Sequence, residues 1–101
     1  MQTYVIMRRG AWRTPDEVHA ALTRSSTESE WASVDPLRSY VLAELDGSLG
    51  TVCIYDAPSP EAIRLHAYRA SLPVDEIVAV ADTVVVRDEA MTTGEGGSSC
   101  T

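Results

Sequence analysis

The sequence contains no lysine, no phenylalanine and no long hydrophobic run. Proteins that bind nucleic acid normally cluster Lys and Arg, whereas the basic residues of this chain are scattered arginines. Eight basic against fifteen acidic residues give a formal charge of −7, which would repel a phosphate backbone. No stretch approaches the roughly 18 apolar residues that a membrane helix needs. We therefore expect no nucleic-acid partner and no membrane partner.

Cysteine is also scarce, and the N-terminus lacks the pattern of a secretion signal. Cys53 lies in a strand-like run and Cys100 in a tail, so the two do not form a disulfide framework. The apolar run Met1–Met7 is short and is followed by Arg8 and Arg9, which reverses the charge order of a signal peptide. These features predict a cytoplasmic protein in which Cys53 is reduced.

The length of the chain favours a single domain. A chain of 101 residues with 45% apolar content can bury one sheet under covering helices, but not two separate cores. Residues 88–101 are rich in Gly, Ser and Thr and have no periodic pattern, which is typical of a flexible tail. We predict a domain at residues 1–87 and a C-terminal tail at 88–101.

Four strand-like runs alternate with two helical patterns. The predicted strands are Met1–Arg9, Ser39–Leu45, Thr51–Asp56 and Glu76–Val86. Thr14 and Ser59 are each followed by proline, which indicates a helix cap and a first helical residue. The first helix is expected to end near Ser26, and a loop is expected over residues 25–36. Residues 46–50 have the composition of a hairpin turn.

The order β-α-β-β-α-β predicts an α+β, ferredoxin-like domain. Its four strands form an antiparallel sheet, and both helices cover the same face. The strands are nevertheless apolar on both faces, so the face without helices would expose a large apolar patch. A second copy packing sheet against sheet would cover that patch. The expected partner is therefore the protein itself, as a homodimer through the open sheet face.

His66 is the first candidate for chemistry. It lies on the inner stripe of the second predicted helix, where it can be a buried, hydrogen-bonded histidine, a metal ligand or an acid–base group. Cys53 is either a small core residue or a ligand. Tyr40 and Tyr55 supply core volume and a hydroxyl each. The hairpin register decides which sheet face Tyr40, Cys53 and Tyr55 occupy, and the sequence leaves that open. Glu44 lies in phase with Tyr40, near the hairpin end.

These side chains could form a mixed-ligand metal site. One nitrogen, one sulfur and several oxygens, from His66, Cys53, Tyr40 and Glu44, would suit nickel or another divalent transition metal. No paired-ligand spacing such as HxxxH or CxxC accompanies them. The motifs GxSxG, GxGxxG and the P-loop are absent as well, so we expect no organic cofactor.

Three runs of the sequence, SYV, CxYxAPSPEAIRxHA and LPVDEIVAV, resemble a small bacterial domain family of unknown function that includes a nickel-binding protein. The resemblance covers most of residues 3–86 and is most specific over 40–77. It implies a dimeric ferredoxin-like fold and a metal site at or near His66, Cys53 and Tyr40. The chain departs from the family pattern near Leu37, where an aromatic is expected, and at Ser71, where glycine is expected. It departs also at residues 7–9, where an acidic residue is expected.

Three functions follow from this pattern. The leading hypothesis is a homodimeric ferredoxin-like protein that binds a divalent transition metal, nickel first, at His66. The second is a small cofactor-free enzyme of the monooxygenase, isomerase or cyclase type. It would act on a small hydrophobic ligand between sheet and helices, with His66, Tyr40 and Tyr55 as its catalytic residues. The third is a non-catalytic dimerisation or ligand-sensing module, for which a packed interior and a His66 bonded to backbone would be the sign.

Overall fold

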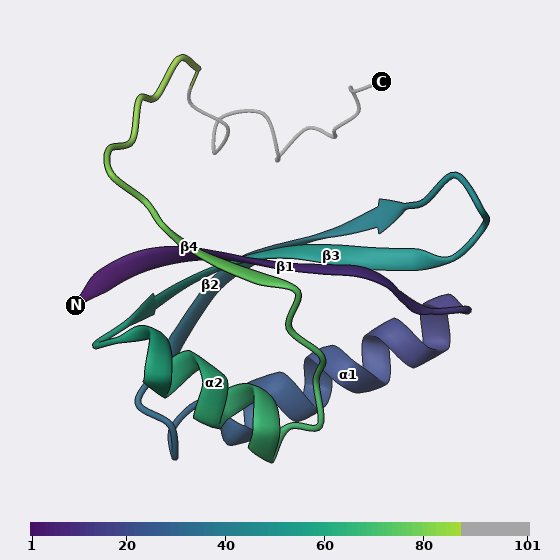
Figure 1. The fold of residues 1–101 in the computed structure, drawn as a ribbon, viewed down its shortest axis with the longest axis horizontal. Helices are drawn as coiled ribbons and strands as arrows, with labels where there is room; N and C mark the ends of the chain where they lie inside the picture. Colours follow the sequence, from purple (N-terminus) through teal and green to yellow (C-terminus); the bar gives the residue numbers. More distant parts are fainter. Residues whose placement is uncertain (88–101) are drawn as a thin grey trace.

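The computed structural model describes residues 1–87, which form a four-stranded sheet and two helices (Figure 1). In chain order the elements are β1 (Gln2–Trp12), α1 (Pro15–Glu28), β2 (Asp35–Ala43), β3 (Leu49–Ala57), α2 (Pro60–Arg69) and β4 (Glu76–Ala79). Both helices lie on the same side of the sheet (Figure 1). The predicted α+β, ferredoxin-like fold is confirmed.

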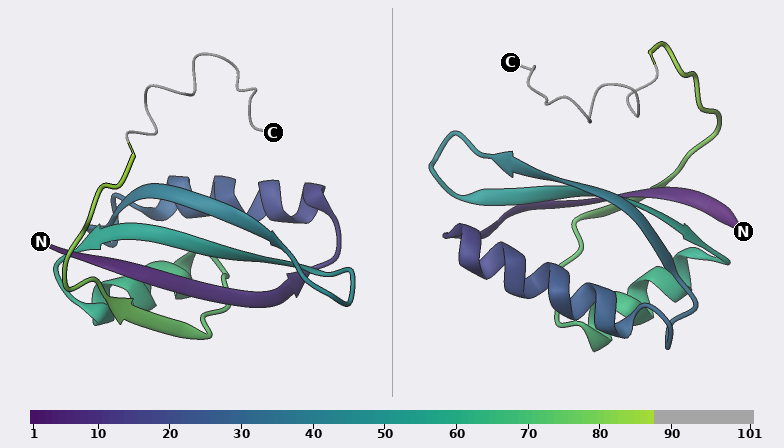
Figure 2. Two further views of the ribbon diagram at one scale, coloured as in Figure 1. Left: turned by 90° about the horizontal axis from the view of Figure 1, so that it is seen from above. Right: turned by 180° about the vertical axis from the view of Figure 1, so that it is seen from behind.

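The strands lie in the order β2-β3-β1-β4, and every neighbouring pair is antiparallel (Figure 2). In the central pair, Tyr4 lies opposite Tyr55 and Ile6 lies opposite Cys53. Directly opposed residues share a sheet face, so these four side chains point the same way. All four are buried, and with Ile63 of α2 they belong to the main core between sheet and helices.

No helix covers the other face of the sheet (Figure 2), and apolar residues of the strands lie on it. Val5 and Met7 of β1 alternate with the buried Tyr4 and Ile6 and are only half-buried. Val78 of β4 lies opposite Val5 and is 45% exposed. Both sheet faces are thus apolar, as the sequence predicts, but the described part of the chain covers one of them.

Both helices begin where the sequence predicts. The Thr14 hydroxyl accepts a hydrogen bond from the backbone N–H of Glu17, and the Glu17 carboxylate accepts one from the N–H of Arg13. Ser59 caps α2 in the same way, through the N–H of Ala62. These bonds satisfy N–H groups that a helix start otherwise leaves unpaired. No helix within residues 1–87 is long and apolar enough to cross a bilayer.

The prediction of a long fourth strand was wrong. β4 ends at Ala79, whereas the valine-rich pattern predicted a strand to Val86. Ala79 pairs with Tyr4, and the N–H of Val80 donates to the carbonyl of Thr3. Because β1 begins at Gln2, little of its backbone remains to pair with residues further along. The chain then leaves the sheet on the side away from the helices (Figure 1).

Other boundaries also differ from the prediction. β1 continues past Gly10 to Trp12, through a register shift against β3 and a positive φ of 58° at Gly10. α1 continues to Glu28, and β2 spans Asp35–Ala43 rather than residues 39–45, so the predicted loop over 25–36 is shorter. The predicted tail at 88–101 lies outside the described residues.

Candidate functional site

His66 lies in the interior, where α2 meets α1 and the sheet. Its side chain is fully buried. Nε2 is 2.8 Å from the backbone carbonyl oxygen of Ser25 and 3.3 Å from the Ser25 hydroxyl. A carbonyl oxygen can only accept, so Nε2 carries the proton and donates. In the neutral ring Nδ1 then keeps a free lone pair, and it has no hydrogen-bond partner among the described residues.

The surroundings favour the neutral form of this imidazole. Burial is the largest effect and lowers the pKa of His66 below its ordinary value, and the nearby positive charge of Arg8 lowers it further. The carbonyl of Ser25 acts in the opposite direction, since it accepts a hydrogen bond from the ring. His66 is therefore a neutral base at physiological pH, with one nitrogen committed to α1 and the other available.

Tyr55 of β3 completes the contact with α1. Its hydroxyl is 2.7 Å from the hydroxyl of Ser25, and its ring meets the His66 ring edge-on with 5.2 Å between the centroids. Burial raises the pKa of Tyr55, while the bond to Ser25 and the charge of Arg8 oppose that rise. Ser25 thus joins the phenol and the imidazole in one buried polar cluster.

Cys53 lies next to Tyr55 on the same face of β3 and is a buried, free thiol. Its sulfur accepts a hydrogen bond from Nη1 of Arg8 over 3.3 Å and another from the hydroxyl of Ser39 over 3.2 Å. Both donors come from neighbouring strands, since Ser39 lies on β2 and Arg8 on β1. Cys53 is consequently a hydrogen-bond acceptor in the same core as Tyr55, and not only an apolar filler.

Tyr40 does not belong to this cluster. It pairs with Val52, and its neighbour Ser39 pairs with Cys53, so the ring of Tyr40 projects from the opposite face of the sheet. Its hydroxyl accepts a hydrogen bond from Arg38 over 3.0 Å. The hairpin register therefore puts Cys53 and Tyr55 on the His66 side and Tyr40 on the open side.

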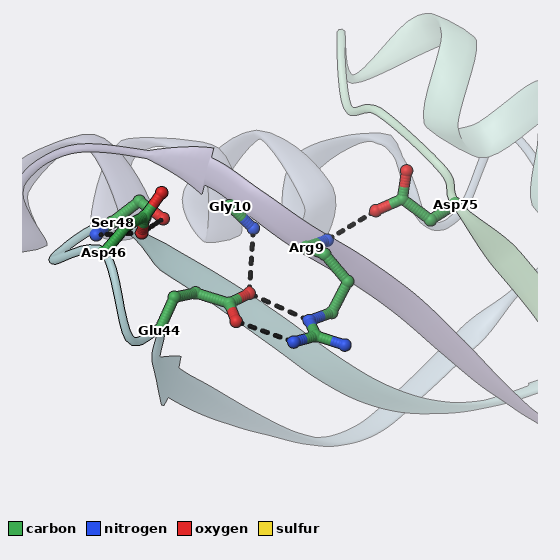
Figure 3. A network of polar contacts seen from close by, with 6 residues as sticks. All are labelled: Arg9, Gly10, Glu44, Asp46, Ser48 and Asp75. Atoms are coloured by element: carbon green, nitrogen blue, oxygen red, sulfur yellow. Dashed lines mark hydrogen bonds and ion pairs between the residues drawn. The ribbon is translucent and has the colours of Figure 1, made fainter.

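Glu44 lies at the hairpin between β2 and β3, and its hydrogen-bond partners come from β1 (Figure 3). Its carboxylate accepts two hydrogen bonds from the Arg9 guanidinium and one from the N–H of Gly10. The bond from Arg9 is the main reason that the pKa of Glu44 is lowered. In the adjacent turn, Asp46 accepts from the backbone and the hydroxyl of Ser48 (Figure 3). Glu44 thus fixes the approach of the hairpin to β1.

Two residues of the interior cluster were not predicted as site residues. Ser25 lies near the predicted end of the first helix, where a loop was expected to begin. Arg8 is 1% exposed, although a lone arginine in a strand is ordinarily solvated. Its position in phase with Tyr4 and Ile6 was the available signal, because that phase places all three on one sheet face.

Two surface hollows of the described chain are lined by other residues. One, of about 570 Å³, follows a single side of α1 from His19 to Thr27. Another, of about 350 Å³, lies at the hairpin around Arg9 and Glu44. Both are open to solvent. His66, Tyr55 and Cys53 line neither of them.

Comparison with known proteins identifies the family of this chain. The model of the family described as "Nickel responsive protein SCO4226-like" matches residues 4–80. The chain belongs to this family. The resemblance drawn from the sequence is thereby confirmed.

Among solved structures, the chain is similar to SCO4226 from Streptomyces coelicolor A3(2). The TM-score is 0.68 at 23% identity, over 81% of this chain and 99% of that chain. At this identity the likeness bears on the fold alone. No match was found among curated proteins.

The family description makes nickel the ligand to test against the site. Imidazole nitrogen and cysteine sulfur are donors that suit nickel, and Nδ1 of His66 is available. Within residues 1–87, however, no group of three or more His, Cys, Asp or Glu side chains could hold a metal ion. The donor chemistry of His66 and Cys53 fits the metal. The number of donors does not complete a coordination sphere within the described chain.

Proposed function

We propose that the protein is a homodimeric nickel-responsive protein that binds a divalent transition metal, nickel first, through His66. The observation that carries this proposal is the buried Nδ1 atom of His66, whose lone pair is free because Nε2 donates to the carbonyl of Ser25. Metal-bound histidines usually donate their other ring N–H to a carbonyl or carboxylate, which fixes the tautomer. The description of the family supports nickel as the metal.

His66 would supply the nitrogen donor and Cys53 a sulfur donor, and the bound ion would act as the signal to which the protein responds. Water or groups outside one described chain would fill the other positions. His66 is fully buried, so entry of the metal requires local opening between α1 and α2. Tyr40 and Glu44 are left out of this ligand set because they lie on the open sheet face and at the hairpin.

The homodimer is part of the proposal. Its support is the uncovered apolar sheet face, to which β1, β3 and β4 all contribute half-buried or exposed side chains. Burying such a face against a second copy is favourable at about 25 cal/mol per Å² of apolar surface. The exposed valines Val84–Val86 leave the sheet on the same side (Figure 1) and would add to the contact. A cytoplasmic location, expected from the sequence, belongs to the same proposal.

A non-catalytic ligand-sensing module is the second candidate. It is favoured by the bond of His66 to the Ser25 backbone within a close-packed interior. The enzyme alternative has less support, because Tyr40 lies on the other sheet face and the two hollows described above are lined by residues outside the cluster.

Isothermal titration of the full chain with Ni²⁺ tests the metal assignment. The informative variant is His66→Gln, whose amide can still donate to the carbonyl of Ser25 but offers no imidazole nitrogen. The matched control is His19→Gln, which removes the second histidine of the chain from an exposed position on α1. We expect wild type and the His19 variant to bind and the His66 variant to lose most of its affinity.

Two results would contradict the proposal. Wild type that takes up no Ni²⁺, Cu²⁺ or Zn²⁺ would exclude metal binding by the isolated protein. Loss of binding in the His19 variant with retention in the His66 variant would move the site to the surface of α1.

A further inference from the structure

Arg8 is a buried cation without an acidic partner. Its side chain is 1% exposed and lies on the helix-covered face of β1. Nε donates to the carbonyl of Pro73 over 2.7 Å, and Nη1 donates to the sulfur of Cys53. Two other arginines of the described chain do form ion pairs: Arg9 pairs with Glu44, and Arg69 pairs with Glu28. No carboxylate within residues 1–87 offsets the charge of Arg8.

The guanidinium also has donors to spare. Nη2 of Arg8 has no hydrogen-bond partner in the described chain. Thr51 lies directly opposite Arg8 in the sheet, is fully buried, and has an equally unpartnered hydroxyl. Two buried donors therefore project from adjacent strands into the same layer between sheet and helices. An unpaired buried polar group costs about 1–3 kcal/mol, and a charged one more.

A bound water would satisfy the hydrogen bonds but would leave the charge. An uncompensated ion in a protein interior costs several kcal/mol, so a ligand that brings a negative charge is strongly favoured over a neutral one. The chain has a formal net charge of −7, which repels anions from its surface. Binding of an anion at an internal site is therefore easier to distinguish from binding at the surface. Arg8 is 1% exposed and Thr51 is fully buried, so only a small ion could be accommodated between them.

We infer that Nη2 of Arg8 and the hydroxyl of Thr51 form an internal binding site for a small monovalent anion. Chloride and formate are the probes, because each carries one negative charge on a compact acceptor. This inference does not rest on the proposed function, and it is tested on the metal-free protein.

Thermal unfolding of the full-length, metal-free protein tests the site. Sodium chloride or sodium formate replaces sodium gluconate at constant ionic strength, since gluconate is too large for the interior. A ligand that binds only the folded state stabilises it in a saturable way. At several times the dissociation constant, we expect the melting temperature of wild type to rise by about 5 °C.

Two variants localise the effect. Arg8→Met keeps a long side chain and removes the charge, and Thr51→Val keeps the β-branched shape and removes the donor. Arg64→Met is the control, because Arg64 is exposed on α2. We expect the saturable rise in Arg64→Met, a weakened rise in Thr51→Val and none in Arg8→Met.

The outcomes separate cleanly. A rise that is absent in wild type, or that is as large in the Arg8 and Thr51 variants as in wild type, would overturn the inference. If Arg8→Met does not fold, the comparison of wild type with Thr51→Val still decides. Because no metal is present, the result is unaffected by the outcome of the nickel titration.

Discussion

The imidazole of His66 donates a hydrogen bond from Nε2 to the backbone carbonyl of Ser25 over 2.8 Å, and this bond joins α2 to α1. The ring is buried, and burial is the main reason that its pKa lies below the ordinary value. The folded state therefore holds this histidine neutral, whereas the unfolded chain takes up its proton near a pKa of about 6.5.

Acidification should accordingly destabilise the protein. Below about pH 6.5 the unfolded state binds more protons than the folded state, so stability is complete above that pH and is lost as the pH falls toward the lowered folded-state pKa. We predict that the free energy of unfolding in urea falls by on the order of 1 kcal/mol between about pH 7.5 and 5.5. In His66→Gln this pH dependence should be much smaller.

His19→Gln provides the control for this titration, because His19 is exposed on α1. It should retain the wild-type pH dependence. A pH dependence of stability that persists in the His66 variant and vanishes in the His19 variant would assign the effect to His19 and not to His66.

The sequence predicted the fold well because local signals agreed with each other. The Thr14 and Ser59 caps and the hairpin turn determine the element order, and the structure retains all of them. The extent of β4 could not be predicted in this way. Its valine pattern continues to Val86, but a strand extends only as far as its neighbour, and β1 begins at Gln2.

The site was harder to predict than the fold. The inner stripe of α2 was enough to place His66 inward, and the structure does so. The face of Tyr40 depended on the register of the hairpin, in which Ala43 lies opposite Leu49 and Tyr40 lies opposite Val52. A change of that register by one residue would exchange the two faces of the strand, and the alternation of residues alone does not determine the register. Arg8 was missed because β1 is apolar on both faces, so its pattern does not show which face meets the helices.

Glycine at position 71 should stabilise the protein. Ser71 follows α2 with a positive φ of 57°. The N–H of Leu72 donates to the carbonyl of Ala67, and the N–H of Ser71 donates to that of Tyr68, which is the Schellman arrangement that usually contains glycine. A left-handed backbone costs a residue with a Cβ about 1 kcal/mol. We predict that Ser71→Gly gains about 0.5–1 kcal/mol in urea unfolding, after the entropy of glycine is counted.

Ser71→Ala separates the backbone effect from the loss of the hydroxyl. It retains the Cβ and should not be stabilised. An alanine variant as stable as the glycine variant would assign the gain to the side chain instead of the backbone.

The open sheet face predicts a dimer that one charge can dissociate. Val78 on this face and Leu65 on the outer side of α2 are similarly exposed, at 45% and 48%. An arginine at position 78 would have to be buried against the second copy without an acidic partner, which is unfavourable by several kcal/mol. We predict a dimeric wild type by sedimentation equilibrium, a dimer for Leu65→Arg, and at least about tenfold weaker association for Val78→Arg. A monomeric wild type, or dissociation of the Leu65 variant alone, would contradict the proposed interface.

Gly50 permits the close approach of β3 to β1. A Cβ at this position would lie 2.5 Å from the backbone oxygen of Arg8 and 2.7 Å from Oε2 of Glu44. The first contact is with backbone, so the two strands would have to separate next to the pair of Arg8 and Thr51. We predict that Gly50→Ala lowers the free energy of unfolding in urea by about 2–3 kcal/mol, in the range of overpacked interiors.

The same substitution in a Glu44→Ala background tests the cause. If the backbone contact dominates, the loss persists there; a loss that disappears would assign the strain to the Glu44 carboxylate.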